Sequence, residues 1–175
     1  MSDFMIDIMI DLETLGIRDD ALVTQISAKA FRLGKQTSDM ANVNPFNRFL
    51  DFKSLDVLEN VEVGTLNFWL KDAHNVETFK SMLSRNSDTP DTCNDYDLWH
   101  NFHSWLAQFA SSEEIRIWGN GISFDIVKIK TNFQRFGLDI PFMFWNERDV
   151  RTIVDLGAEK LGITSRDFQK SVPNN

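Results

Sequence analysis

The spacing of apolar and polar residues predicts strands in the first third of the chain. Residues 4–10 form an apolar run interrupted once by Asp7, which is typical of a strand that enters a sheet interior. Residues 21–31 alternate between apolar and polar, and a glycine-containing turn over 15–20 joins the two segments as a hairpin. A third strand is expected at 46–51, so the chain opens with a meander of three antiparallel strands.

From residue 65 onward the apolar spacing becomes that of helices. One helix is predicted from an N-cap at Thr65 to about Leu83. A second is predicted over 98–109, with Asp95 and Asp97 at its N-terminal end. Packing on a sheet or pairing with a second subunit would satisfy the apolar stripe of this second helix equally well.

The last third of the chain alternates strands with helices, and no internal repeat or flexible linker divides it. The predicted elements are a strand at 115–118, a helix from 123 to about 135, a strand at 141–145, a helix from 150 to about 160 closed by Gly162, and a polar loop at 170–175. Residues 1–175 are therefore assigned to a single domain. We expect a three-layer α/β domain whose central mixed sheet, three antiparallel strands followed by α/β alternation, is flanked by helices.

Composition narrows the class of protein. At 175 residues and 42% hydrophobic, the chain can bury a full core, and Cys93, its single cysteine, cannot form an internal disulfide. Without a membrane-length apolar run or a secretory signature, we expect a soluble, cytoplasmic protein that has no membrane partner. The net charge of −8 argues against coating nucleic acid by charge, yet allows a metal site where the ion meets phosphate.

Asp11 and Glu13 form the first candidate site. Side chains at i and i+2 on a strand project from one face, so the two carboxylates can converge on a divalent cation. Hard oxygen ligands suit magnesium, manganese or calcium. From spacing alone, two solvated acids at a surface strand end are an equally good interpretation.

Asp125 is the third acid of interest. It lies in the first turn of a predicted helix, directly after a strand and a glycine-flanked bend, where α/β domains gather functional groups. The alternative is an aspartate that only complements the helix dipole.

Four stretches in order resemble motifs of the DEDD superfamily of 3′-5′ exonucleases. They are DLET at 11–14, TLNFW at 65–69, NGISFD at 120–125 and FWNERDVRT at 144–152. DLET and NGISFD resemble the first two motifs of the superfamily, and TLNFW and FWNERDVRT look like the additional signatures of the phage DexA-type exonucleases and the Rv2179c-like exoribonuclease domains. The resemblance implies a ribonuclease-H-like fold and covers about residues 4–156.

The resemblance also implies a chemistry. Asp11, Glu13 and Asp125 would be the catalytic acids and would hold two Mg²⁺ or Mn²⁺ ions roughly 4 Å apart. The reaction would be hydrolysis of phosphodiester bonds at the 3′ end of single-stranded DNA or RNA.

Substrate contacts follow from the same resemblance. Thr14, Leu15 and Gly16 would contact the terminal nucleotide, with Asn120 and Phe124 in the same pocket; Leu15 could equally be a core side chain. Trp69 would contact the substrate by stacking, and a core role is its alternative. The remaining implied contacts, to the acids or to phosphates, come from Arg148, Asp149 and Arg151; their alternative is an ordinary ion pair at a helix start.

The third DEDD motif, an acid preceded at short spacing by a histidine or tyrosine, has no counterpart here. His74, Tyr96, His100 and His103 all precede Asp125, so chain order excludes them. Asp155 and Asp167 remain as possible fourth acids, but neither follows a histidine or tyrosine. We expect the domain to lack the C-terminal helix that bears this motif.

Three hypotheses remain open. The chain is an exonuclease without its last helix, a natural end-binding module that has lost hydrolysis, or a domain that shares only the fold. The first is favoured for ancestry, while the activity of the 175-residue form stays open. The choice between DNA and RNA and the oligomeric state are not encoded in these motifs.

Overall fold

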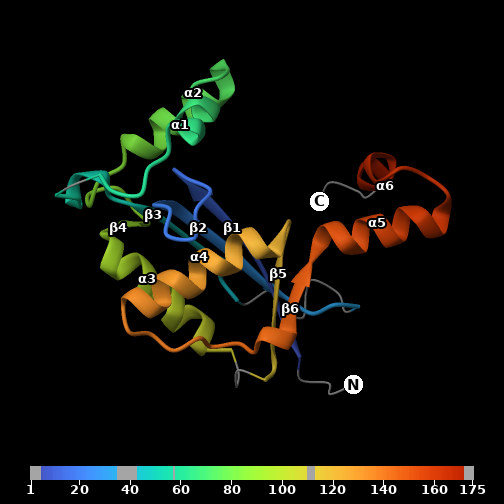
Figure 1. Ribbon diagram of the computed structural model, residues 1–175. Coiled ribbons are helices and arrows are strands. Elements are labelled where there is room, and N and C mark those ends of the chain that lie inside the picture. Colours follow the sequence, from blue (N-terminus) through green and yellow to red (C-terminus); the bar gives the residue numbers. More distant parts are fainter. Residues whose placement is uncertain (1–4, 35–42, 57, 110–112, 172–175) are drawn as a thin grey trace.

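The computed structural model describes residues 5–34, 43–56, 58–109 and 113–171. These residues form a mixed six-stranded sheet in the order β4-β3-β2-β1-β5-β6 (Figure 1). The strands are β1 Ile6–Thr14, β2 Val23–Phe31, β3 Phe46–Leu50, β4 Thr92–Cys93, β5 Ile115–Gly119 and β6 Glu147–Asp149.

Strand β1 lies inside the sheet and determines where the acids sit. It pairs antiparallel with β2 and parallel with β5, and β2 pairs antiparallel with β3. The predicted meander is therefore confirmed. Two further parallel pairs, β3 with β4 and β5 with β6, complete the mixed sheet.

Helices cover one face of the sheet and extend beyond it. They are α1 Val63–Trp69, α2 Ala73–Leu83, α3 Asp95–Ala107, α4 Ile122–Arg135, α5 Val150–Leu161 and α6 Ser165–Ser171, with short 3-10 turns at Phe52–Ser54 and Phe144–Asn146. In Figure 1, α3 and α4 lie across the sheet, α1 and α2 form a separate pair, and α5 and α6 extend from the β6 edge. No helix in the described ranges is long and apolar enough to cross a membrane.

The alternation within β1 explains the core. Its even-numbered residues, among them Ile8 and Ile10, are buried in one cluster with Trp99 and Phe102 of α3 and Phe133 of α4. The apolar stripe of α3 is thus satisfied by packing inside the chain.

Asp7, which interrupts the apolar run, is fully buried. Its carboxylate accepts hydrogen bonds from the Trp118 indole at 2.7 Å, the Arg116 guanidinium at 2.6 Å and the Leu33 amide at 2.9 Å. A buried charge is tolerated here because three donors satisfy it.

The predicted helix from Thr65 to Leu83 is wrong in two respects. The chain forms two helices, because the Asp72 side chain accepts from the Asn75 amide and so begins α2. The N-cap of α1 is Glu62, and Thr65 lies inside the helix.

The predicted strand at 141–145 is also wrong. Phe142 is buried, but Phe144 and Trp145 are exposed in a 3-10 turn, and the strand is β6, at the three residues that follow Asn146. An apolar run of this length does not distinguish a strand from a turn that buries one ring.

The polar loop predicted at 170–175 is wrong where the structure describes it. Lys170 and Ser171 belong to α6, and residues 172–175 lie outside the described ranges. The helices predicted over 98–109, from 123 to about 135 and from 150 to about 160 are confirmed, as is the strand at 115–118.

Candidate active site

Asp11 and Glu13 lie toward the C-terminal end of β1. Their side chains project from the face of the strand opposite to that of its even-numbered residues. Asp11 is exposed and Glu13 is half-buried. Their register partners on β2 are Ser27 and Gln25. The spacing argument therefore holds: both carboxylates project from the same face of one strand.

Asp125 reaches this strand from α4. It is 6% exposed, and the backbone amide of Leu12, the residue between the two acids of β1, acts to lower the pKa of its carboxyl group. The approach requires Gly119, because a Cβ there would lie 2.9 Å from Asp125 Oδ2. Gly121, with a φ of 95°, makes the bend that starts α4.

The three carboxylates influence each other electrostatically. Burial and the negative charge of Asp11 raise the pKa of Asp125 to about 7, against the opposing effects of Lys128, the Leu12 amide and Arg151. Burial and the charge of Asp11 likewise raise the pKa of Glu13. In the absence of a cation, these acids therefore repel one another.

The grouping is not a preformed metal cage. Within the described ranges, no three histidine, cysteine, aspartate or glutamate side chains are already gathered closely enough to hold a metal ion. What the residues provide is an all-oxygen donor set with excess negative charge, which suits a hard divalent cation.

A cavity of about 440 Å³ lies beside the acids. It is lined by Leu12, Glu13, Thr14, Ile17, Glu62, Gly64, Thr65, Phe68, Trp69 and Phe124. Of the residues predicted to contact the terminal nucleotide after β1, Thr14 lines this cavity. Leu15 is buried in a second core cluster, which supports its alternative interpretation as a core residue, and the buried Gly16 is not among the lining residues.

Trp69 has a supporting position. It is 5% exposed, stacks on Phe79 and donates its indole N–H to the Thr14 carbonyl at 3.1 Å, so it holds the end of β1. Its neighbour Phe68, which the sequence argument missed, is 56% exposed and offers its ring to the cavity. Phe68 lies off the apolar stripe of its helix, and an aromatic residue at such a position is expected to be exposed. This position was the sequence signal that could have identified Phe68.

Asp149 holds the bend before α4. Its side chain accepts from the Gly121 amide at 2.9 Å, the Arg151 amide at 3.2 Å and the Thr152 hydroxyl at 3.3 Å. Burial acts to raise the pKa of Asp149, but these hydrogen bonds together lower it. The residue therefore connects the start of α5 to the bend that positions Asp125.

The other polar residues of this segment divide into two groups. Arg151 donates from Nε to Asn120 Oδ1 at 3.4 Å, so both lie at the bend. Arg148, in β6, donates to the carbonyls of Trp145 and Glu147, so its side chain folds back onto the segment that precedes it.

The model of the 3′-5′ exoribonuclease Rv2179c-like domain matches residues 6–173. The chain belongs to this family.

Solved structures similar to this exoribonuclease-like domain include exonucleases. E. coli exonuclease I in complex with a dT13 oligonucleotide has a TM-score of 0.59 at 15% identity, over 88% of this chain and 30% of that chain. The same enzyme with a 5cy-dA13 oligonucleotide has a TM-score of 0.60 at 14% identity, again over 88% and 30%. Apo exonuclease I has a TM-score of 0.57 at 15% identity, over 91% and 32%.

These similarities confirm the predicted ribonuclease-H-like α/β fold. The chain spans about a third of the length of the exonuclease I chains it matches. No curated protein matches the sequence significantly.

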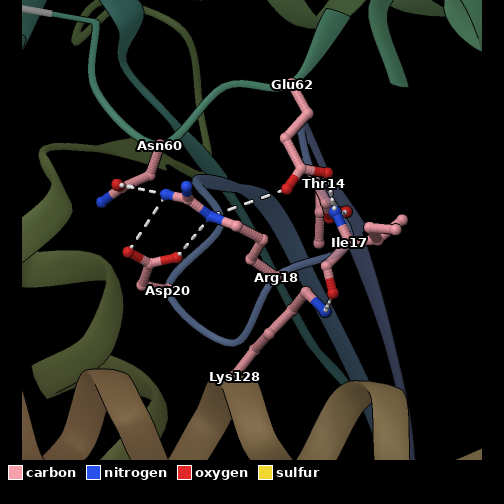
Figure 2. A network of polar contacts seen from close by, with 8 residues as sticks. Thr14, Ile17, Arg18, Asp20, Asn60, Glu62 and Lys128 are labelled. Atoms are coloured by element: carbon pink, nitrogen blue, oxygen red, sulfur yellow. Dashed lines mark hydrogen bonds and ion pairs between the residues drawn. The ribbon is translucent and has the colours of Figure 1, made fainter. Parts of the chain in front are cut away.

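Two charged residues of the exoribonuclease-like domain that the sequence argument missed adjoin the cavity. Lys128 of α4 is 0% exposed, and Glu62 precedes α1; both side chains reach the turn after β1 (Figure 2). A lysine on an amphipathic helix reads as solvated, so no sequence signal marked Lys128.

The histidines and tyrosine of α3 are engaged elsewhere. Tyr96 stacks on His100 with centroids 3.7 Å apart, both contact Phe136, and His103 packs edge-on against Phe133. They belong to the α3–α4 packing.

Asp155 and Asp167, the possible fourth acids, serve α6. Asp155 accepts from the Ser165 hydroxyl at 2.6 Å. Asp167 accepts from the Thr164 hydroxyl at 2.7 Å and donates its amide back to it at 3.1 Å, a capping arrangement.

Proposed function

We propose that this chain is a divalent-metal-dependent 3′-5′ exonuclease of the DEDD type, which hydrolyses phosphodiester bonds at the 3′ end of single-stranded DNA or RNA. The observation that carries the proposal is the position of Asp125, which is buried against the end of β1, where both the charge of Asp11 and the Leu12 backbone amide act on its carboxylate. Membership of the exoribonuclease family supports the same assignment.

The donor set fits the implied cofactor. Asp11, Glu13 and Asp125 would hold two Mg²⁺ or Mn²⁺ ions, since carboxylate oxygens are the ligands these ions prefer. When bound, such ions activate an attacking water and stabilise the departing oxygen of an in-line displacement. The raised pKa values of Asp125 and Glu13 reflect charge that a cation would neutralise.

The chain's own residues prepare the substrate. The cavity between the exposed rings of Phe68 and Phe124 would take the terminal nucleotide by stacking, which tolerates any base. Thr14 also lines the cavity, and its hydroxyl donates to the Gly16 carbonyl at 2.8 Å. Glu13 lines the cavity, so a bound terminal nucleotide would place its 5′ phosphate next to the acids.

A second candidate is a module that binds 3′ ends without cutting them. It is favoured by the placement of Tyr96, His100 and His103 in the α3–α4 packing, which removes them as general bases for the acids. For such a module, hydrolysis would require a general base that these histidine and tyrosine side chains do not provide.

Hydrolysis of a 5′-labelled single-stranded DNA or RNA in Mg²⁺ or Mn²⁺ decides between the two candidates. We expect a ladder of products shortened from the 3′ end, lost in Asp11→Asn and retained in Asp139→Asn, which removes an exposed carboxylate after α4. Metal-dependent binding of the labelled strand by fluorescence anisotropy, with no shortening, would select the end-binding module. Shortening that persists in Asp11→Asn would contradict the proposed mechanism.

A further inference from the structure

The turn that follows β1 presents an apolar side chain at the cavity. Ile17 is 72% exposed and lines the cavity, an unfavourable position for an isoleucine unless something covers it. Its peptide groups are held from two sides. The Ile17 amide donates to Glu62 Oε2 at 2.8 Å, and the Ile17 carbonyl accepts from Lys128 Nζ at 3.2 Å (Figure 2).

Lys128 is costly at this position. Its Nζ is enclosed by two carbonyl oxygens, those of Ile17 and of Phe124 at 3.3 Å, and by the Phe124 ring, whose centroid is 3.3 Å away. Burial lowers the pKa of Lys128, against the opposing charges of three carboxylates, those of Asp125, Asp19 and Glu62. A buried ammonium that is met mainly by carbonyl oxygens rather than by a direct ion pair destabilises the fold compared with an apolar residue of the same size. Its placement therefore calls for a role other than stability.

Both groups that Lys128 contacts are walls of the cavity. Phe124 and Ile17 come from α4 and from the turn, respectively, and each lines the cavity while Lys128 lies behind them. The Lys128 ammonium thus contacts both Ile17 and Phe124, two walls of the cavity that are far apart in sequence.

Glu62 completes the arrangement from the other side. Although it occupies the N-cap position of α1, its side chain makes no capping hydrogen bond and is directed to the turn. It also lies 3.6 Å from Arg18 Nε, and Arg18 in turn bonds to Asp20 and Asn60 (Figure 2). Gly16 permits this close approach of the Glu62 carboxylate, since a Cβ at Gly16 would lie only 3.3 Å from the carboxylate carbon.

We propose that Lys128 and Glu62 are positioning residues that clamp the two peptide groups flanking Ile17, and that this Ile17 clamp sets the fit of the cavity to the terminal nucleotide. The inference rests on the proposed function for what the cavity binds. It gives the two residues a role in substrate affinity rather than in the chemical step.

The variants that test the Ile17 clamp each change one contact. Lys128→Met removes the donor at similar length, and Lys130→Met is its matched control, because Lys130 is on the same helix and pairs with Glu147. Glu62→Ala removes the acceptor, whereas Glu62→Gln keeps an acceptor oxygen for the Ile17 amide.

Kinetics on a single-stranded oligonucleotide give the first readout. We expect Lys128→Met and Glu62→Ala to raise KM by about tenfold, the scale of one hydrogen bond to a charged group, with kcat nearly unchanged. Glu62→Gln and Lys130→Met should keep the KM of the unmodified chain. The double variant Lys128→Met/Glu62→Ala should raise KM by less than the product of the single effects, because the two residues hold the two peptide groups that flank Ile17.

Hydrogen exchange of the 14–20 segment gives a second readout that requires no activity. Exchange should accelerate in Lys128→Met and Glu62→Ala but not in the two controls. Should Lys128→Met fail to unfold cooperatively, the Glu62→Ala and Glu62→Gln pair carries the test.

Unchanged KM and unchanged exchange in Lys128→Met and Glu62→Ala would overturn the inference. A loss confined to kcat would also overturn it, since it would assign Lys128 to the charge of Asp125. An unmodified chain that shortens no substrate would refute the proposed function separately, while the exchange data still decide the clamp.

Discussion

The end of β1 and the α5–α6 arm, defined as residues 153–171 beyond the contacts of Arg151 and Thr152 with the bend, are held in different ways. Around β1, hydrogen bonds join residues far apart in sequence: Glu62 to Ile17, Trp69 to Thr14 and Lys128 to Ile17, separated by 45, 55 and 111 positions. In the arm, the bonds of Asp155 and Asp167 span 10 and 3 positions. The candidate site depends on the whole fold, whereas the arm is local.

Burial follows the same division. At the end of β1 the polar supports Asp125 and Lys128 are buried, while the arm exposes apolar side chains. These exposed residues are Ile153, Leu156, Leu161 and Ile163. Substitutions near β1 should therefore change function strongly, and equivalent substitutions in the arm should change little beyond the arm.

The same substitution made in each region should separate them most clearly. A Cβ at Gly119 would lie 2.9 Å from Asp125 Oδ2, so Gly119→Ala displaces the third acid and should lower kcat/KM by about 100-fold. In the arm, a Cβ at Gly157 would lie 2.8 Å from the Phe168 ring, which can rotate away. Gly157→Ala should leave kcat/KM nearly unchanged and accelerate hydrogen exchange in α6. Equal losses of activity in the two variants would contradict the division.

The buried charge of Asp125 should appear in stability without metal. Its pKa of about 7 in the fold lies above the ordinary value of 3.8, so its contribution to stability is lost as pH rises from about 4 to 7. In chelator, Asp125→Asn should gain about 1–3 kcal/mol in unfolding free energy over the unmodified chain between pH 5 and pH 8. Urea unfolding at both pH values measures this.

The control for Asp125→Asn is Asp139→Asn, which removes an exposed carboxylate. It should give no pH-dependent gain. A similar gain in both variants would show that net charge, rather than the burial of Asp125 beside Asp11, is responsible.

The indole bond of Trp69 offers a smaller test. Trp69→Phe removes the donor to the Thr14 carbonyl and should cost about 1 kcal/mol of stability while raising KM severalfold. Trp105→Phe removes an indole bond of the same length, to the Asn44 carbonyl at 3.1 Å, which is exposed and away from the acids. It should lower the melting temperature by less than Trp69→Phe and leave KM unchanged, and a KM increase of equal size in both variants would count against the positioning role of Trp69.

Local patterns predicted much of this molecule. The apolar run at 4–10 correctly indicated the strand β1, the i and i+2 spacing indicated the common face of Asp11 and Glu13, and the amphipathic stripes indicated α3 and α4. They failed where one residue or one ring decides the structure: Asp72 divides a continuous stripe into two helices, as its side chain begins α2.

The supports of the site could not be predicted because they are long-range. Nothing near Lys128 in sequence indicates that its ammonium reaches the carbonyl of Ile17, since the contact exists only once α4 lies against the turn. The contact of Asp125 with the Leu12 amide is of the same kind. The sequence indicated the three candidate acids, whereas the long-range contacts around them are visible only in the folded chain.

Manganese binding tests the central claim, that Asp11, Glu13 and Asp125 act as one metal site, most directly. Calorimetric titration of the unmodified chain with Mn²⁺ at pH 8 should give saturable binding that weakens toward pH 6, because Asp125 must ionise. Asp11→Asn, Glu13→Gln and Asp125→Asn should each abolish or sharply weaken it, while Asp139→Asn should not. Mn²⁺ affinity unchanged in all three site variants would contradict the account.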